Sequence, residues 1–127
     1  MLETLEGFPD NVLALRAHGN VTAEDYREVL VPGVEARLAE HRRMRLLYVL
    51  GEEFERFTGG AAWEDAKVGL RHFVDFERVA VVSDEEWVRR MVRGFGFALP
   101  GEVRVFDLAG FETAADWIRM PVAPVDP

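Results

Sequence analysis

The stretch LLYVL at residues 46–50 decides the fold class, together with the similar run VAVV at residues 79–82. Short, unbroken apolar runs of this kind are typical of strands that are covered on both faces of a sheet. Between the two runs, Trp63, Lys67 and Leu70 follow the spacing of one helix face. The order of strand, helix and strand predicts a parallel crossover unit with two central strands.

Upstream of this unit, residues 2–6 and 12–17 have the pattern of two further strands. Pro, Asp and Asn lie between them and favour a tight turn, so we expect an antiparallel, hairpin-like start. In the second strand, apolar residues alternate with positions that include Arg16 and His18. This period of two predicts a strand with one wetter face, close to an edge of the sheet.

The first helix is predicted to begin after Thr22, whose hydroxyl can accept a hydrogen bond from a free backbone N–H of the first turn. Pro32 interrupts this helix, because its ring collides with the carbonyl four residues earlier. The helix therefore either kinks near Glu28 or restarts with Pro32 in a new first turn. Arginines up to Arg45 are expected at its carboxyl end, where cations favour the helix dipole. Its apolar stripe consists of Tyr26, Leu30, Val34 and Leu38.

The same order of elements repeats in the second half. Ser83 and Glu86 have the spacing of a capping box before a helix that runs through Trp87. A last strand is predicted at residues 103–106, and a last helix buries Phe111, Ala114, Ala115 and Ile118. The sequence predicts one α/β domain over residues 1–119, with a small mixed sheet of about five strands flanked by about four helices. Residues 120–127 are rich in proline and are expected to form a mobile tail.

Composition narrows the classes of function. The chain has 127 residues and a formal net charge of −8, which repels nucleic acid and anionic lipid headgroups, so we expect neither nucleic-acid nor membrane contact. No apolar run is long enough to cross a bilayer, and the chain contains no cysteine. These properties suit a cytoplasmic protein and exclude disulfides and Cys-ligated zinc. No cofactor motif is present.

Several segments together resemble the SpoIIAA-like family, whose fold is related to STAS domains and to CRAL-TRIO lipid-binding domains. The resemblance spans nearly the whole chain and depends mostly on core and cap residues. These are the segments NVTAEDY at residues 20–26, Pro32, WEDAK at residues 63–67 with Leu70 to His72, RVAVVSD at residues 78–84 with Trp87, and AADWI at residues 114–118.

This resemblance implies homodimers and roles in binding or regulation, without an established enzymatic activity. The better-known relatives, the anti-sigma-factor antagonists, are switched by phosphorylation of a serine between the strand after the first helix and the second helix. The corresponding residues 51–62 contain no serine, and Thr58 is the one hydroxyl candidate. Glu52, Glu53 and Glu55 would repel a phosphate there, so the sequence gives little support for this switch.

A candidate surface follows the third predicted strand. Phe54, Phe57 and Trp63 lie near the Gly59-Gly60 pair, and a connection this apolar needs a cover. The aromatic rings either line a pocket for a lipid-like apolar ligand, or cap the core and meet a second subunit, which is the commoner use of aromatic side chains. Phe95 and Phe97 after the third helix form either a second wall or an ordinary helix exit.

No catalytic or metal site is evident from the sequence. The three histidines lack partners at the spacing of metal ligands, and Asp65 and His72 are two helical turns apart. The leading hypothesis is a non-enzymatic binding or regulatory module that forms a dimer and recognises a protein partner or a small apolar ligand through the aromatic stretch from Phe54 to Trp63. The alternative is a small enzyme whose site is completed at a subunit interface, with Asp65, Lys67 or His72 as the reactive group.

Overall fold

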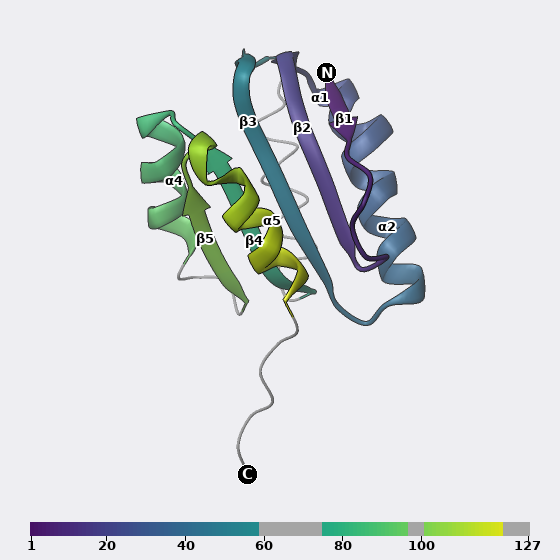
Figure 1. The fold of residues 1–127 in the computed structure, drawn as a ribbon. Helices are drawn as coiled ribbons and strands as arrows, with labels where there is room; N and C mark the ends of the chain where they lie inside the picture. Colours follow the sequence, from purple (N-terminus) through teal and green to yellow (C-terminus); the bar gives the residue numbers. More distant parts are fainter. Residues whose placement is uncertain (59–74, 97–100, 121–127) are drawn as a thin grey trace.

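The computed structural model describes residues 1–58, 75–96 and 101–120. Five strands form one sheet and lie side by side in chain order (Figure 1). β1 is antiparallel to β2, and all the following neighbours are parallel, which confirms the mixed sheet with an antiparallel start. The strands are β1 (Leu2–Thr4), β2 (Val12–Val21), β3 (Met44–Phe57), β4 (Phe76–Ser83) and β5 (Glu102–Phe106).

Three helical segments lie in the described part of the chain, against about four helices expected for the whole. The first joins α1 (Ala23–Asp25), a π-helical turn η1 (Tyr26–Leu30) and α2 (Val31–Glu40). The second is α4 (Glu86–Gly96), and the third is α5 (Phe111–Arg119) behind a short 3-10 turn η2 (Leu108–Gly110). The helix predicted around Trp63 lies outside the described residues, as does most of the proposed proline-rich tail.

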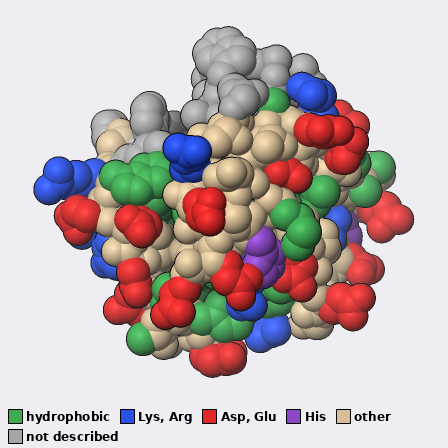
Figure 2. Space-filling model, turned by 90° about the horizontal axis from the view of Figure 1, so that it is seen from above, with side chains coloured by type: hydrophobic (Ala, Val, Ile, Leu, Met, Phe, Trp, Pro, Cys, Tyr) green, Lys and Arg blue, Asp and Glu red, His purple; other side chains and the backbone are tan. Residues whose placement is uncertain are grey.

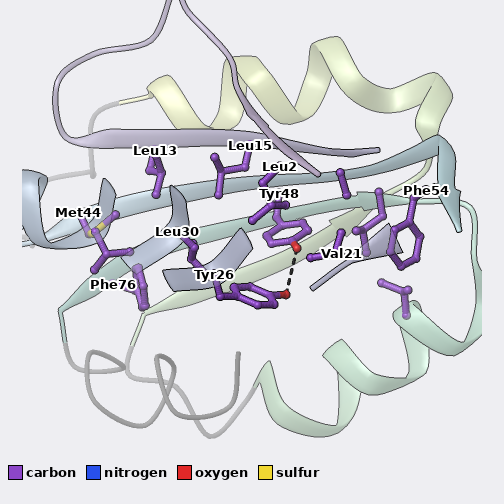
Figure 3. Close-up of a cluster of buried hydrophobic side chains, with 14 residues drawn as sticks. Leu2, Leu13, Leu15, Val21, Tyr26, Leu30, Met44, Tyr48, Phe54 and Phe76 are labelled. Carbon is purple, nitrogen blue, oxygen red and sulfur yellow. Dashed lines mark hydrogen bonds between the residues drawn. The ribbon is translucent and has the colours of Figure 1, made fainter. Parts of the chain in front are cut away.

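The helices cover both faces of the sheet (Figure 1). β2 to β5 follow one another across the sheet, and right-handed crossovers then place their connecting helices on the same face. α2 and α4 accordingly share one face, where a core forms around Leu13, Leu15 and Tyr48 (Figure 3). α5 covers the other face, where Ala114 and Ile118 pack against Leu47 and Val49 among others.

The wetter face expected for β2 is found in its second half, where Arg16 and His18 are partly exposed, but not in its first half, because Val12 and Ala14 are buried under α5. The expected end of the third strand needs correction. β3 continues to Phe57, well beyond the predicted end at residue 50. The helix that buries the second face of β2 belongs to the far end of the chain, which a local pattern cannot reveal.

The first helix begins as predicted. The Thr22 hydroxyl accepts from the Asp25 N–H at 3.2 Å, and the Asp25 carboxylate accepts from the Thr22 N–H at 2.9 Å. Of the two alternatives for Pro32, the structure shows the second, because Pro32 lies in the first turn of α2. The preceding turn widens so that Val31 N–H donates to the Tyr26 carbonyl. Further on, Ser83 differs from the prediction, because its hydroxyl accepts from Glu85 N–H at 3.0 Å.

Arg45 does not lie at a helix end as expected, since α2 ends at Glu40 and Arg45 belongs to β3. It is buried, and its guanidinium donates to the Ile118 carbonyl at 2.8 Å, to the Met120 carbonyl and to Glu77 at 2.8 Å. Arg78 on β4 is equally buried and donates to the carbonyls of Trp117 and Met120 at 2.9 and 2.8 Å. The two arginines therefore satisfy the carbonyl groups that remain free at the end of α5.

We predict that Arg45→Met lowers the free energy of unfolding by about 2–4 kcal/mol, because buried carbonyls and Glu77 lose their charged donor. Arg104→Met is the matched control. Arg104 lies on the neighbouring strand β5 over the Trp117 ring, with 4.8 Å between guanidinium carbon and ring centroid, but more than half of its side chain is exposed. Urea unfolding measures both variants, and equal losses would contradict the role given to Arg45.

Gly101 gives a second stability prediction. A Cβ at this position would lie 2.3 Å from the Phe76 carbonyl oxygen and 2.8 Å from that of Glu77. Because backbone must move to accommodate it, Gly101→Ala should cost about 2–4 kcal/mol of stability. Gly51→Ala serves as control, since a Cβ there meets nothing within 4 Å and should change stability by about 0.5 kcal/mol at most. Thermal and urea unfolding that found Gly101→Ala as stable as this control would refute the prediction.

Candidate functional site

Three connections leave the sheet at the carboxyl ends of its parallel strands. β2 leads into η1 with Tyr26, β3 ends with Phe54 and Phe57, and β4 leads into α4 with Trp87. Carboxyl ends of parallel strands meet at one edge of a sheet, which is the usual place for binding sites in α/β proteins. We refer to these four residues as the aromatic cluster.

The rings of the aromatic cluster are in mutual contact. The Phe54 and Phe57 centroids are 5.0 Å apart, and Trp87 lies 6.4 Å from Phe54 and 6.0 Å from Phe57, edge-on to the latter. Tyr26 stacks on Phe57 at 6.4 Å. Such pairs stabilise by about 0.5–1.5 kcal/mol beyond the area that they bury. The mutual contacts therefore fix the positions of the four rings relative to one another.

Burial decreases from the inside of the cluster to the outside. Tyr26 is fully buried, and its hydroxyl lies 3.1 Å from the hydroxyl of Tyr48 on β3, where the dashed line in Figure 3 marks their hydrogen bond. Phe54 is buried and Phe57 is half-buried. Trp87 has 45% of its surface exposed, although it is the largest side chain of the cluster. An exposed indole on a packed aromatic base is a typical anchor for a binding partner.

The predicted candidate surface is thus found in part. Phe54 and Phe57 lie together as expected, but on the end of β3 and not in a loop. Trp63, Phe97 and the side chain of Phe95 lie outside the described residues. Sequence reasoning missed Trp87 because its helical spacing also fitted an ordinary core stripe, and Val88 beside it is the residue that faces the core. Trp87 lies four residues after the end of β4, and this position near the carboxyl end of a parallel strand could have indicated a place in the binding surface.

A second cluster occupies the same edge on the opposite face of the sheet. His18 lies between two carboxylates, with Nε2 2.7 Å from Glu3 of β1 and Nδ1 hydrogen-bonded to Glu53 of β3. The pairing of β2 with β3 is irregular here, and Gly19 has a φ of +56°, a conformation suited to glycine. This irregularity positions His18 beside Glu53. The face seen in Figure 2 carries many acidic side chains, with a histidine among them.

The hydrogen bond to Glu3 raises the pKa of His18 above its ordinary value; partial burial opposes this, and Glu53 adds to the rise. With a carboxylate at each ring nitrogen, both nitrogens can donate only in the imidazolium form. Protonated His18 thus links β1, β2 and β3 through two charge-assisted hydrogen bonds. The pair of carboxylates lies at opposite ends of the ring, so the three groups do not converge on one point.

Comparison with known proteins identifies the fold. The sequence model of the SpoIIAA-like family matches residues 12–119. The chain belongs to the SpoIIAA-like family. A crystal structure of an uncharacterized protein with a SpoIIAA-like fold from Shewanella loihica PV-4 is similar to it, with 30% identity, a TM-score of 0.73 and coverage of 93% of this chain and 92% of that one. The search of proteins with curated functions found no match.

Membership of the SpoIIAA-like family supports a binding or regulatory module in general terms. Thr58, the candidate for a phosphorylation switch, follows β3 directly, is half-buried, and donates its backbone N–H to the Val21 carbonyl at 2.8 Å. Its modification stays a prediction. The reactive groups considered for an enzyme, Asp65, Lys67 and His72, lie outside the described residues. None of the described helices has the length and apolar character needed to cross a membrane.

The pKa of His18 predicts a dependence of stability on pH. The folded-state pKa is raised, so the stabilisation is fully present below the unfolded value of about 6.5 and is lost as pH rises through the folded value. Wild type should therefore exceed His18→Gln in stability at pH 6 and lose this advantage towards pH 9. Urea titrations across this range measure it, with the imidazole resonance of His18 followed by NMR. Glu3→Gln should shift that resonance towards an ordinary titration, and an unchanged midpoint would contradict the assignment.

Proposed function

We propose that this SpoIIAA-like protein is a cytoplasmic, non-enzymatic binding module that recognises a protein partner through the aromatic cluster. A second copy of the chain is the simplest such partner. The observation that carries the proposal is the exposure of Trp87 on top of Phe54 and Phe57. Large aromatic side chains dominate the energetics of interfaces, because they bury much area at a small cost in side-chain entropy.

The position of the cluster supports recognition of a partner over chemistry. It consists of aromatic rings at the carboxyl edge of the sheet, and the Tyr26 and Tyr48 hydroxyls lie 3.1 Å apart in the buried interior below them. Nucleophilic or acid–base catalysis needs a titratable group within hydrogen-bonding reach of a substrate. Tyr26 is the titratable side chain of the cluster, and it is fully buried, so the exposed part of the cluster offers mainly apolar contact area.

Two hollows of the described surface lie away from the aromatic cluster, which favours a protein partner over a small apolar ligand there. One lies between α4 and β5 and is lined by arginines as well as by Val103 and Val105. The other lies beside the turn between β1 and β2. Neither is lined by Phe54, Phe57 or Trp87. Small-molecule sites enclose most of their ligand, whereas a protein partner can cover an exposed indole from outside.

Native mass spectrometry and analytical ultracentrifugation test the proposal on the full chain at micromolar concentration. Wild type should be a dimer. Trp87→Ser should weaken association about 30-fold or more, because loss of a central aromatic anchor usually costs about 2 kcal/mol of binding free energy. Met120→Ser is the matched control, because Met120 is a similarly exposed apolar residue, 52% accessible, outside the cluster. It should leave association unchanged.

A monomer without a bound molecule in the wild-type spectrum would refute the dimer, and equal effects of the two substitutions would refute the role of Trp87. A co-purified apolar molecule that disappears in Trp87→Ser would replace the protein partner by a small ligand at the same cluster. Thermal unfolding accompanies both variants. Because Trp87 is exposed, Trp87→Ser should unfold within a few degrees of wild type, so that a change in association is not a loss of the fold.

A further inference from the structure

A group of metal-ligating side chains comes together at the opposite, amino-terminal end of β2 and β3. Asp10 precedes β2, and Glu40 and His41 precede β3. One ligand atom from each residue lies within 4.8 Å of the other two. Glu40 and His41 are adjacent, but Asp10 lies about thirty positions before them, so no short spacing around a histidine indicated a metal ligand.

Local structure fixes this arrangement from two sides. In the turn between β1 and β2, Val12 N–H donates to the Pro9 carbonyl at 2.9 Å, which holds Asp10 at the tip. On the other side, α2 ends at Glu40, and His41 leaves the helix in an extended conformation while its N–H still donates to the Arg37 carbonyl at 2.8 Å. Glu40 and His41 are thereby presented by a hydrogen-bonded helix end.

The imidazole of His41 provides an independent sign of a missing partner. Its Nε2 atom is buried and has no hydrogen-bond partner within the described residues. Buried polar atoms are nearly always paired, and an unpaired one costs about 1–3 kcal/mol. By contrast, both ring nitrogens of His18 are occupied by carboxylates. Of these two histidines, His41 therefore has a ring nitrogen without a hydrogen-bond partner among the described residues, as a metal ligand would need.

We propose that Asp10, Glu40 and His41 bind one divalent transition-metal ion, with Zn²⁺ as the representative cation. Zn²⁺ takes imidazole nitrogen and carboxylate oxygen at about 2.0–2.2 Å, so ligand atoms around one ion lie roughly 3–4 Å apart. Asp10 and Glu40 are exposed and can close the remaining distance by rotating their side chains. The imidazole ligand favours Zn²⁺, Cu²⁺ or Ni²⁺ over Mg²⁺ and Ca²⁺, which prefer oxygen ligands only.

The surrounding charges permit a cation. The nearest positive side chain along α2 is Arg37, whose Nε and Nη1 donate to the carbonyls of Val12 and Gly33, both at 3.1 Å. Its guanidinium is thus held by backbone, and no ion pair of Arg37 with Asp10 or Glu40 is present in the described residues. Two carboxylates with a neutral imidazole leave net negative charge at the site, on a chain whose total charge is −8. Three protein ligands would leave open coordination positions for water.

The test uses the full chain without an affinity tag, stripped of metal with a chelator. Titration of Zn²⁺ at pH 7.5 against a chromophoric competitor should give one ion per chain, and His41→Ala should weaken binding at least tenfold. Glu40→Gln should weaken it as well, and this substitution at an exposed position keeps the fold. His18→Ala is the matched control, because His18 also has two acidic neighbours but cannot direct them to one ion.

Thermal unfolding provides the second readout. Excess Zn²⁺ should raise the unfolding temperature of wild type and of His18→Ala, and should not raise that of His41→Ala, because only binding to the folded state stabilises it. An equal excess of Mg²⁺ should have no such effect. Wild type that binds Zn²⁺ no better than His41→Ala, or a loss in His18→Ala as large as in His41→Ala, would overturn the proposal. Neither result depends on whether the chain dimerises through the aromatic cluster.

Discussion

The attachment of α5 to the sheet by two buried arginines is the interaction on which the rest of the structure depends. Arg45 and Arg78 come from neighbouring strands, and both donate to backbone carbonyls at the end of α5. Without α5, the second face of the sheet would expose a core that includes Leu47 and Val49. A buried cation is costly alone, but here Arg45 donates to two carbonyls and to Glu77. Arg78 donates to two carbonyls and lies over the Trp117 ring, although Arg78 Nε has no hydrogen-bond partner among the described residues. The carbonyls at the end of α5 would otherwise lack donors, and by accepting hydrogen bonds from the two guanidinium groups they offset the cost of burying the charge.

Once both faces are covered, the ends of the strands are the places where side chains can reach a partner. Chain order across the sheet and right-handed crossovers bring the carboxyl ends of β2, β3 and β4 to one edge. This explains why Tyr26, Phe57 and Trp87 meet although they are far apart in sequence. It also explains why the His18 cluster lies at the same edge, on the face that α5 covers elsewhere. The topology therefore places an aromatic cluster on one face of this edge and an ionic cluster on the other.

The sequence was sufficient for features that depend on neighbouring residues. The runs at residues 46–50 and 79–82 located the central strands. Thr22 located the start of the first helix, because its hydroxyl accepts a hydrogen bond from the backbone of a residue only three positions later. It was insufficient where a distant segment decides. Arginine at residue 45 fits a helix end equally well until the carbonyls of α5 are placed against it. Trp87 fits a core stripe until Phe54 and Phe57 are known to extend β3 towards it. Long-range pairing, rather than local propensity, determines these roles.

The two ends of the sheet can act independently of each other. β2 has ten residues, so the turn with Asp10 and the edge with Tyr26 are separated by roughly 30 Å at about 3.3 Å per residue. Substitutions that far apart without shared partners usually have additive effects. Coupling between the ends would need an element with two discrete arrangements, and the first halves of β2 and β3 are instead mostly buried and regularly paired. A cation at Asp10, Glu40 and His41 would therefore stabilise the start of β2 and β3 without altering the surface that carries Trp87.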